Sequence, residues 1–351
     1  MTSFFSVREG AVGDPPQHYG SPLAEQRELA AGRAVVDLSD RDAVTVTGPD
    51  RLSWLDSLLS QHLARLNPGE SAEALLLDPS GRIEYAARVV DDGETAWLLM
   101  DAGTGAGLAA FLERMRFMLR VEVADRSAEF ATVGTLGKPV GGVVTWRDPW
   151  REVVAGGHQY ATVSDHPGAA WTYSETLVPR DALDAFADRP AAGILALEAL
   201  RIAAWRPRAA TELDGTAIPH EFDWMRSAVH LAKGCYRGQE TVAKVHNLGH
   251  PPRRLVMLHL DGSDNVAVAA GDEVHAGEKV VGRVTAAATH YELGPIALAV
   301  VRRATDPAEP LTVAAADGMV AATQEIIVPT DAGAEADVPR LPRLGAVRRD
   351  G

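Results

Sequence analysis

The strongest constraint on the fold is a break near residue 250, after which the sequence shows only short strands and turns. The break is the run Asn247-Leu248-Gly249-His250-Pro251-Pro252, where glycine and two prolines end regular structure. Beyond it, strand-like runs cover residues 254–260, 279–287, 296–302 and 311–314, separated by turns that contain glycine. Several short strands without helices are typical of a small barrel. The sequence therefore predicts a C-terminal β-barrel domain over residues 251–328.

Upstream of the break, helical and strand patterns are mixed. Helical periodicity covers residues 22–31, 52–63, 108–119 and 191–205, and strand patterns cover residues 43–47, 74–77, 81–90 and 96–100. Because the two kinds do not alternate regularly, an α+β fold is favoured over a doubly wound parallel sheet. We expect two α+β subdomains within residues 18–250. A flexible N-terminus is predicted at residues 1–17, and a mobile tail at residues 329–351.

Composition and charge exclude several classes of protein. The net charge is −14, which disfavours direct nucleic-acid binding because phosphates need a positive field. The single cysteine excludes an internal disulfide and a four-cysteine metal site, and no metal site is predicted. The sequence contains no run of about 18 apolar residues, so no membrane span is expected. Its N-terminus lacks the features of a secretory signal, and we expect a cytoplasmic protein with a reduced thiol.

The lone cysteine lies in an eight-residue segment with flanking glycines and cations. The segment is Lys233-Gly234-Cys235-Tyr236-Arg237-Gly238-Gln239-Glu240. If it is extended, Lys233, Cys235 and Arg237 point to the same side. Two cations beside a thiol favour the reactive thiolate. The alternative is that Cys235 is a small buried side chain, as lone cysteines commonly are.

The helical pattern at residues 191–205 carries a carboxylate where an apolar residue is expected. Glu198 lies in the middle of an apolar stripe, between Ile202 and Trp205. A carboxylate in such a stripe is costly unless it is paired or hydrogen-bonded. One interpretation is an internal pair with Arg201, three residues further along the helix. The other is a carboxylate aimed into a pocket, where it can accept hydrogen bonds from the N–H groups of a heterocycle.

The segment around Cys235 resembles the complete signature of the YgfZ family. These are folate-binding proteins related to the T-protein of the glycine cleavage system, and they assist the maturation of iron–sulfur proteins. Residues 46–55 resemble the strand and helix that open that fold, and residues 281–285 and 296–299 resemble its barrel. The resemblance covers residues 18–328 and implies a three-domain T-protein-like (aminomethyltransferase) architecture, with folate held in a central hole.

The resemblance also implies a cofactor, partners and site residues. Leu197-Glu198-Ala199 is similar to the family's helix whose glutamate binds the pterin. The implied cofactor is tetrahydrofolate, and the implied partners are iron–sulfur client proteins or assembly factors. Cys235 would be the catalytic thiol: a ligand to a cluster, an acceptor of sulfur, or a nucleophile toward a folate-linked one-carbon unit. The implied cofactor-binding residues are Glu198, Arg201, Lys233, Gly234, Tyr236, Arg237, Gly238, Gln239 and Glu240.

The sequence departs from the T-proteins where these carry a paired aspartate needed for aminomethyl transfer. Tyr85 and Ala86 stand at those positions, and neither can take a proton from an amine near neutral pH. Glu84 is one position off and, in a regular strand, would point to the other face. We therefore expect an accessory protein for iron–sulfur cluster assembly or repair. The alternatives are a tetrahydrofolate-dependent aminomethyl transferase and an interaction module linked to tRNA modification.

Overall fold

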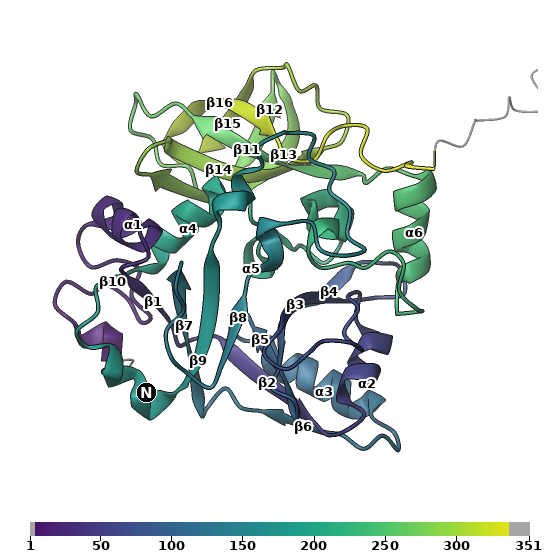
Figure 1. Cartoon of the computed structure of the whole chain (residues 1–351). Helices are drawn as coiled ribbons and strands as arrows, with labels where there is room; N and C mark the ends of the chain where they lie inside the picture. Colours follow the sequence, from purple (N-terminus) through teal and green to yellow (C-terminus); the bar gives the residue numbers. More distant parts are fainter. Residues whose placement is uncertain (1–3, 337–351) are drawn as a thin grey trace, which may run out of the picture.

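The first sheet packs two helices against one of its faces. The computed structural model describes residues 4–336, in which this sheet is antiparallel with the order β3-β4-β5-β2-β6 (Figure 1). Apolar side chains of α2 and α3 fill the space above alternate strand residues. The elements are β2 (Asp42–Thr47), α2 (Arg51–Leu58), β3 (Ser71–Leu77), β4 (Ile83–Asp91), β5 (Thr95–Met100), α3 (Gly105–Met115) and β6 (Glu122–Asp125).

The second sheet has the order β10-β1-β7-β9-β8 and is antiparallel apart from the β1–β10 pair. Its elements and the helix before it are α1 (Pro22–Ala30), β1 (Val35–Leu38), β7 (Phe130–Leu136), β8 (Val144–Arg147), β9 (Tyr173–Pro179) and β10 (Ala191–Ala192). It is followed by α4 (Ile194–Ala203), α5 (Ala209–Glu212) and α6 (Gln239–Leu248). Short 3₁₀ helices are η1 (Phe4–Val7), η2 (Pro149–Arg151), η3 (Pro167–Ala170), η4 (Arg180–Phe186), η5 (Pro219–Phe222) and η6 (Trp224–Arg226).

The C-terminal part is a closed barrel, as the sequence predicts. Its strands close in the order β11-β14-β13-β12-β15-β16 around an apolar interior of their own. The strands are β11 (Arg253–Leu260), β12 (Glu273–Ala276), β13 (Lys279–His290), β14 (Gly294–Arg302), β15 (Leu311–Ala315) and β16 (Gly318–Ile326). Of these, β12 and β16 are absent from the sequence prediction. The mixed α+β class is confirmed, and no helix between residues 4 and 336 is long and apolar enough to cross a membrane.

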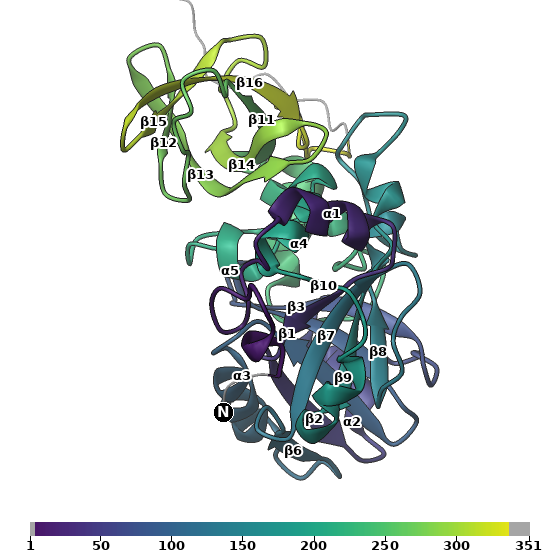
Figure 2. The same cartoon turned by 90° about the vertical axis from the view of Figure 1, so that its left-hand side faces the viewer.

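The largest apolar cluster joins both sheets, α4 and the barrel. Buried members include Leu75 of β3, Trp146 of β8, Leu197 of α4 and Leu298 of β14. Figure 2 shows α1 and α4 between the barrel and the two sheets, and α4 contacts both β13 and β14. Side chains on α4 are therefore presented at the junction of the three parts.

The two ends of the described range contact the rest of the protein through a few buried side chains, and the flexible N-terminus and mobile tail stay predictions. Phe5 is fully buried in an apolar cluster with Val133 and Leu183, and Val12 pairs with His18 in an isolated bridge. After the barrel, Ala332 is buried in the central cluster. Arg8 also donates to the backbone carbonyls of Phe186, Ala187 and Arg189, and the turn residues of this segment do not reveal these contacts. Residues 1–3 and 337–351, also covered by these two predictions, lie outside the described residues.

Candidate functional site

Glu198 lies in a polar pocket at the junction of the two sheets and α4. Three aromatic rings, Trp146, Trp171 and Tyr173, form part of its wall. The cavity volume is about 30 Å³, enough for one or two water molecules and too small for a ring-shaped ligand. The charged residues that line it are Arg41, Arg88, Asp148, Glu175, Glu198, Arg201, Arg206 and Arg208.

Both carboxylate oxygens of Glu198 are occupied by arginines. Oε2 accepts from Nη2 and Nε of Arg201 at 2.8 and 3.1 Å, and Oε1 accepts from Nη1 of Arg208 at 2.6 Å. Burial alone would raise the pKa of the Glu198 carboxyl, but the two guanidinium charges outweigh it and lower the pKa. The carboxylate is therefore ionised, and both sequence interpretations hold: it pairs with Arg201 and also faces the pocket.

A second charged network forms the opposite wall of the pocket. Glu175 pairs with Arg41 and, at 3.1 Å, with Nε of Arg88, whose Nη2 donates to Asp101 at 2.7 Å. Three buried atoms here have no hydrogen-bond partner: Oε2 of Glu175, Nη1 of Arg88 and Nε of Arg208. Buried polar atoms are rarely left without a partner. The pocket therefore has one acceptor and two donors available to a ligand.

Glu212 connects this pocket to the barrel. Its fully buried carboxylate accepts from Nη1 of Arg201 at 3.2 Å and from the backbone N–H of Arg208 at 2.5 Å. The hydroxyl of Thr285, on β13, donates to the other oxygen at 2.9 Å. Both arginines that hold Glu198 are thus positioned by a residue that is itself bonded to a barrel strand.

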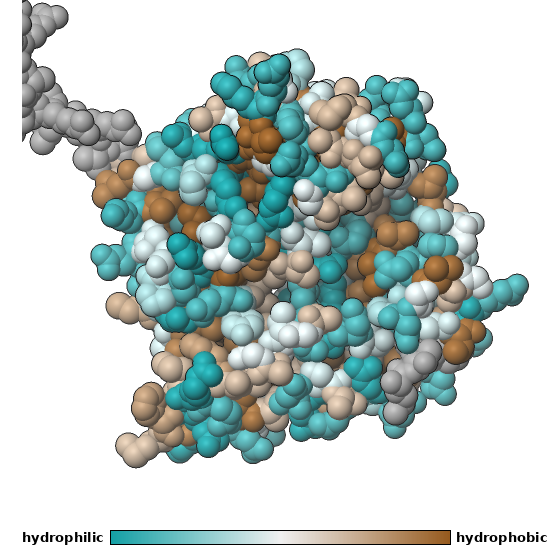
Figure 3. All heavy atoms as spheres, turned by 180° about the vertical axis from the view of Figure 1, so that it is seen from behind, coloured by the Kyte–Doolittle hydropathy of each residue, from teal (hydrophilic) through white to brown (hydrophobic). Residues whose placement is uncertain are grey.

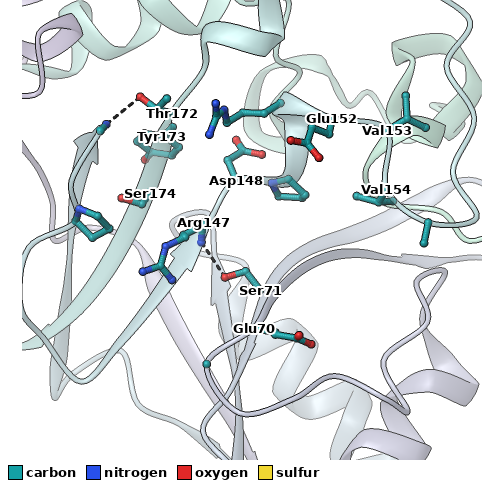
Figure 4. A pocket seen from close by; sticks show the side chains of 16 residues that line it. Glu70, Ser71, Arg147, Asp148, Glu152, Val153, Val154, Thr172, Tyr173 and Ser174 are labelled. Atoms are coloured by element: carbon teal, nitrogen blue, oxygen red, sulfur yellow. Dashed lines mark hydrogen bonds between the residues drawn. The ribbon is translucent and has the colours of Figure 1, made fainter.

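A wide groove adjoins the pocket. Its cavity volume is about 740 Å³, and Asp148 and Tyr173 line both the groove and the pocket. Figure 4 shows these two residues with Arg147 and Ser71, whose Oγ accepts from the backbone N–H of Arg147 at 2.9 Å. An open groove therefore leads to a narrow, charged inner pocket.

The segment around Cys235 is held by Lys233, which is directed into the protein. Its side chain is fully buried, and Nζ donates to the backbone carbonyls of Asp56, Leu59 and Gln61. Burial lowers the pKa of Lys233, partly offset by the carboxylate of Asp56 at 3.6 Å. These carbonyls lie at and beyond the end of α2. The predicted helix over residues 52–63 is too long, because α2 ends at Leu58 and the backbone of Leu59 is extended.

Further residues of the same segment fasten it to the β3–β4 turn. Gly238 has φ +82°, and a Cβ atom there would lie 2.6 Å from the carbonyl oxygen of Asp78. Only glycine permits both this conformation and this approach. Arg237 pairs with Glu84 at 2.5 Å, and Tyr236 is buried. We call the segment from Lys233 to Gly238 the Cys235 clamp, because the residues on both sides of Cys235 are fixed to the rest of the protein.

Cys235 itself is exposed. This excludes the interpretation of a buried structural cysteine. The predicted alignment of Lys233, Cys235 and Arg237 on one side of an extended strand is wrong, because the segment bends and turns. Lys233 is directed inward to carbonyls and Arg237 to Glu84, so the expected pair of cations beside the thiol is not formed.

The structure separates the two groups of predicted site residues. Of the implied cofactor-binding residues, only Glu198 and Arg201 line the pocket, and no residue from 233 to 240 lines the pocket or the adjoining groove. Gly234 and Glu240 are exposed, and the Gln239 side chain donates to the carbonyl of Lys233 at 3.4 Å. The predicted site residues do not include Arg41, Arg88 and Glu175, which also line the pocket.

Positions 84–86 of β4 offer no unpaired carboxylate. Ala86 packs against the central cluster, on the same face as Arg88. Tyr85 packs against the α2–α3 side of the sheet, with its hydroxyl close to Gly107. Glu84 lies at an irregularity in the β3–β4 register and is paired with Arg237. Across residues 4–336, no group of three His, Cys, Asp or Glu residues is arranged to hold a metal ion.

Comparison with known proteins identifies the architecture. Residues 253–326 match the family described as the glycine cleavage T-protein C-terminal barrel domain. The crystal structure of the glycine cleavage system aminomethyltransferase T from Bartonella henselae aligns with a TM-score of 0.70 at 18% sequence identity, covering 92% of this chain and 94% of that one. The chain has the T-protein fold. The three-part T-protein-like architecture predicted from the sequence is therefore confirmed.

Two named relatives are distant in sequence, but each matches most of this chain. An aminomethyltransferase of Nostoc sp. is 27% identical over 311 residues, covering 82% of this chain and 81% of the relative. A protein named as a chloroplastic transferase of Arabidopsis thaliana is 25% identical over 305 residues, covering 76% of this chain and 65% of the relative. The chain thus spans about two thirds of the length of that plant relative. Together these similarities extend over most of the chain, at identities below 30%.

Proposed function

We propose that this chain is a cytoplasmic, folate-binding accessory protein of the YgfZ type that supports iron–sulfur cluster assembly or repair. The observation that carries the proposal is the exposed Cys235, held on a clamp made by the other residues of the signature. It is supported by β4, which has Tyr85 and Ala86 where T-proteins carry acids. The proposed partners are iron–sulfur client proteins or assembly factors.

The hydrogen-bonding groups of the pocket fit tetrahydrofolate. A pterin presents adjacent N–H donors and a carbonyl, which match the carboxylates of Glu198 and Glu175 and the unpartnered Nη1 of Arg88. The cavity of about 30 Å³ can hold a pterin only if a side chain moves out of the pocket. Arg208 is the candidate, because its side chain is 25% exposed and Asp101, 3.9 Å from its Nε, offers another partner. When bound, tetrahydrofolate would supply a carrier for a one-carbon unit.

Glu198→Gln tests this assignment. Glutamine keeps the shape and removes the charge, so tetrahydrofolate binding should weaken by about 1.5–3 kcal/mol, the usual range for a hydrogen bond to a charged group. Anaerobic calorimetric titration measures the affinity. Unchanged affinity in the variant would show that Glu198 serves only its internal pairs with Arg201 and Arg208.

The position of Cys235 favours two of its three proposed uses. As a cluster ligand or a sulfur acceptor, the thiol has to be reached by another protein, and its exposure meets that need. As a nucleophile toward a folate-linked unit it would have to face the Glu198 pocket, which it does not line. Cys235→Ser should therefore fold normally and fail to restore iron–sulfur enzyme activity in cells that lack the native protein. Full complementation by the serine variant would refute the proposal.

The second candidate function is aminomethyl transfer, which the names of the relatives and the fold favour. The two functions separate in one experiment, in which an aminomethyl-loaded carrier protein is mixed with the chain and tetrahydrofolate. We expect binding without ammonia release, because general acid–base help worth about 10²–10⁴-fold is missing at Tyr85 and Ala86. Catalytic release of ammonia would establish the transferase instead.

A further inference from the structure

A second groove lies on the other side of the Cys235 clamp, and we call it the α3 groove. It is formed by the start of β4, one face of α3 and the loop after α5, and it has a cavity volume of about 650 Å³. It shares no lining residue with the Glu198 pocket or its adjoining groove. Its rim is exposed at Arg82, Glu84 and Arg114, so the groove is open rather than enclosed. A small ligand is usually held in a more enclosed site.

The α3 groove carries two arginines without a carboxylate partner. Arg237 is paired with Glu84, but Arg82 and Arg114 form no ion pair with any residue between 4 and 336. Asp78, the other acidic residue of the lining, directs Oδ1 to the backbone N–H groups of Ser80 and Arg82. The two free guanidinium groups are therefore available to an external anion.

An aromatic ring forms the apolar part of the groove. Phe111 is partly buried, and the guanidinium carbons of Arg237 and Arg114 lie 5.5 and 6.0 Å from its ring centroid. Just beyond the end of α3, Phe117 and Met118 are 85% and 98% exposed. Figure 3 shows that hydrophobic residues on the back of the molecule form separate patches among hydrophilic ones. Adjacent exposed apolar side chains of this size commonly mark a contact surface.

We propose that the α3 groove, together with Phe117 and Met118, docks an acidic segment of a partner protein. Carboxylates of the segment would pair with Arg82 and Arg114, while apolar side chains would pack on Phe111 and on the exposed pair. The lining contains both cationic and apolar side chains, which suits a peptide that carries acidic and apolar residues.

The α3 groove would be a docking surface beside Cys235, and peptide binding there does not depend on the proposed function of the thiol. Arg237 lines the groove and is two residues from Cys235, so a segment docked there would lie next to the thiol. The Glu198 pocket, where tetrahydrofolate is proposed to bind, shares none of the lining residues of the α3 groove. A variant of the groove should therefore lose peptide binding and keep tetrahydrofolate affinity, whichever role Cys235 has.

The test uses fluorescence polarisation with the full chain and two labelled peptides. One peptide alternates glutamate with phenylalanine, and the other has lysine in place of glutamate. Arg82→Glu/Arg114→Glu reverses the two free charges, Phe117→Ser/Met118→Ser removes the apolar pair, and Arg65→Glu/Lys279→Glu is a control at exposed positions outside the groove. Circular dichroism confirms that each variant is folded.

The acidic peptide should bind the native chain, and the lysine peptide should not. Charge reversal should weaken binding at least about tenfold, the apolar double variant should weaken it several-fold, and the control should change it little. Binding should also weaken as salt is raised. Equal affinity for both peptides, equal losses in the groove and control variants, or displacement of the peptide by micromolar inorganic phosphate would overturn the proposal, the last by revealing a small-anion site.

Discussion

Glu198 holds two arginines, and only one of them belongs to its own helix. Arg201 lies one turn further along α4 with a side chain that is 4% exposed, whereas Arg208 comes from the segment before α5 and is 25% exposed. The more exposed partner can exchange its carboxylate for water or for Asp101 at lower cost. A ligand that needs the Oε1 atom of Glu198 therefore competes with Arg208.

Arg208→Ala should strengthen tetrahydrofolate binding several-fold, because the variant frees one oxygen of Glu198 and enlarges the pocket. Anaerobic titration of the variant beside the native chain measures the change. Weaker binding would show that Arg208 contacts the ligand rather than competing with it. Failure of both proteins to bind would refute the folate assignment itself, so the two failures are distinguishable.

The thiol of Cys235 should react with iodoacetamide at neutral pH in the folded protein, without prior unfolding, because it is exposed. Saturating tetrahydrofolate should leave the rate unchanged, since the thiol does not line the Glu198 pocket. Mass spectrometry of timed samples measures the modified fraction. Protection by tetrahydrofolate would place the thiol at the cofactor, contrary to this structure.

At the scale of elements, the segment from Lys233 to Gly238 acts as a clamp between α2, the β3–β4 turn and α6. The sequence motif reveals which residues are special but not the direction of their side chains. Alternation assumes an extended strand, and this segment bends instead, so Lys233 becomes a buried cap for the carbonyls beyond α2.

Lys233→Met should lower the free energy of unfolding by about 2–3 kcal/mol, because several buried carbonyls lose a charged donor. Methionine keeps most of the side-chain volume, so the loss reports hydrogen bonding rather than packing. Urea denaturation measures the change, with the exposed Lys244→Met as the matched control. Equal stability of the two variants would contradict the capping role.

The link between η5 and η6 carries a buried acid with an unusual pKa. Burial raises the pKa of Asp223 to about 7, although the backbone N–H of Tyr160, 2.6 Å from Oδ1, and the charge of Arg226 oppose the shift. The folded state therefore holds this proton more tightly than the unfolded state. The associated stability is complete below the unfolded pKa of about 3.9 and is lost as pH rises to about 7.

Asp223→Asn removes this titration while keeping an acceptor for the N–H of Tyr160. The stability of the variant relative to the native chain should therefore rise by about 2–3 kcal/mol between about pH 5 and pH 8. Urea denaturation at several pH values measures the difference. Parallel stability profiles for the two proteins would contradict the raised pKa.

At the scale of the whole molecule, local patterns predict the barrel and the α+β class, and the resemblance predicts the T-protein architecture. The pocket is harder to predict because its members are distant in sequence: Arg41 precedes β2, Arg88 is on β4 and Glu175 on β9. One feature of the sequence does indicate a buried charged site. A charged residue within an otherwise apolar strand, such as Arg88 between Ala87 and Val89, needs a buried partner.

The bond between Thr285 and Glu212 has a consequence for how such a chain can change over evolution. Glu212 positions both arginines of Glu198, so a barrel residue helps set the charge balance of a pocket in another part of the molecule. Exchanging the barrel for that of a relative would therefore alter ligand affinity even if every pocket residue were retained. Residues on the outer face of the barrel can change over evolution without affecting the ligand site. Residues on the face that contacts α4 and α5 are constrained by that site.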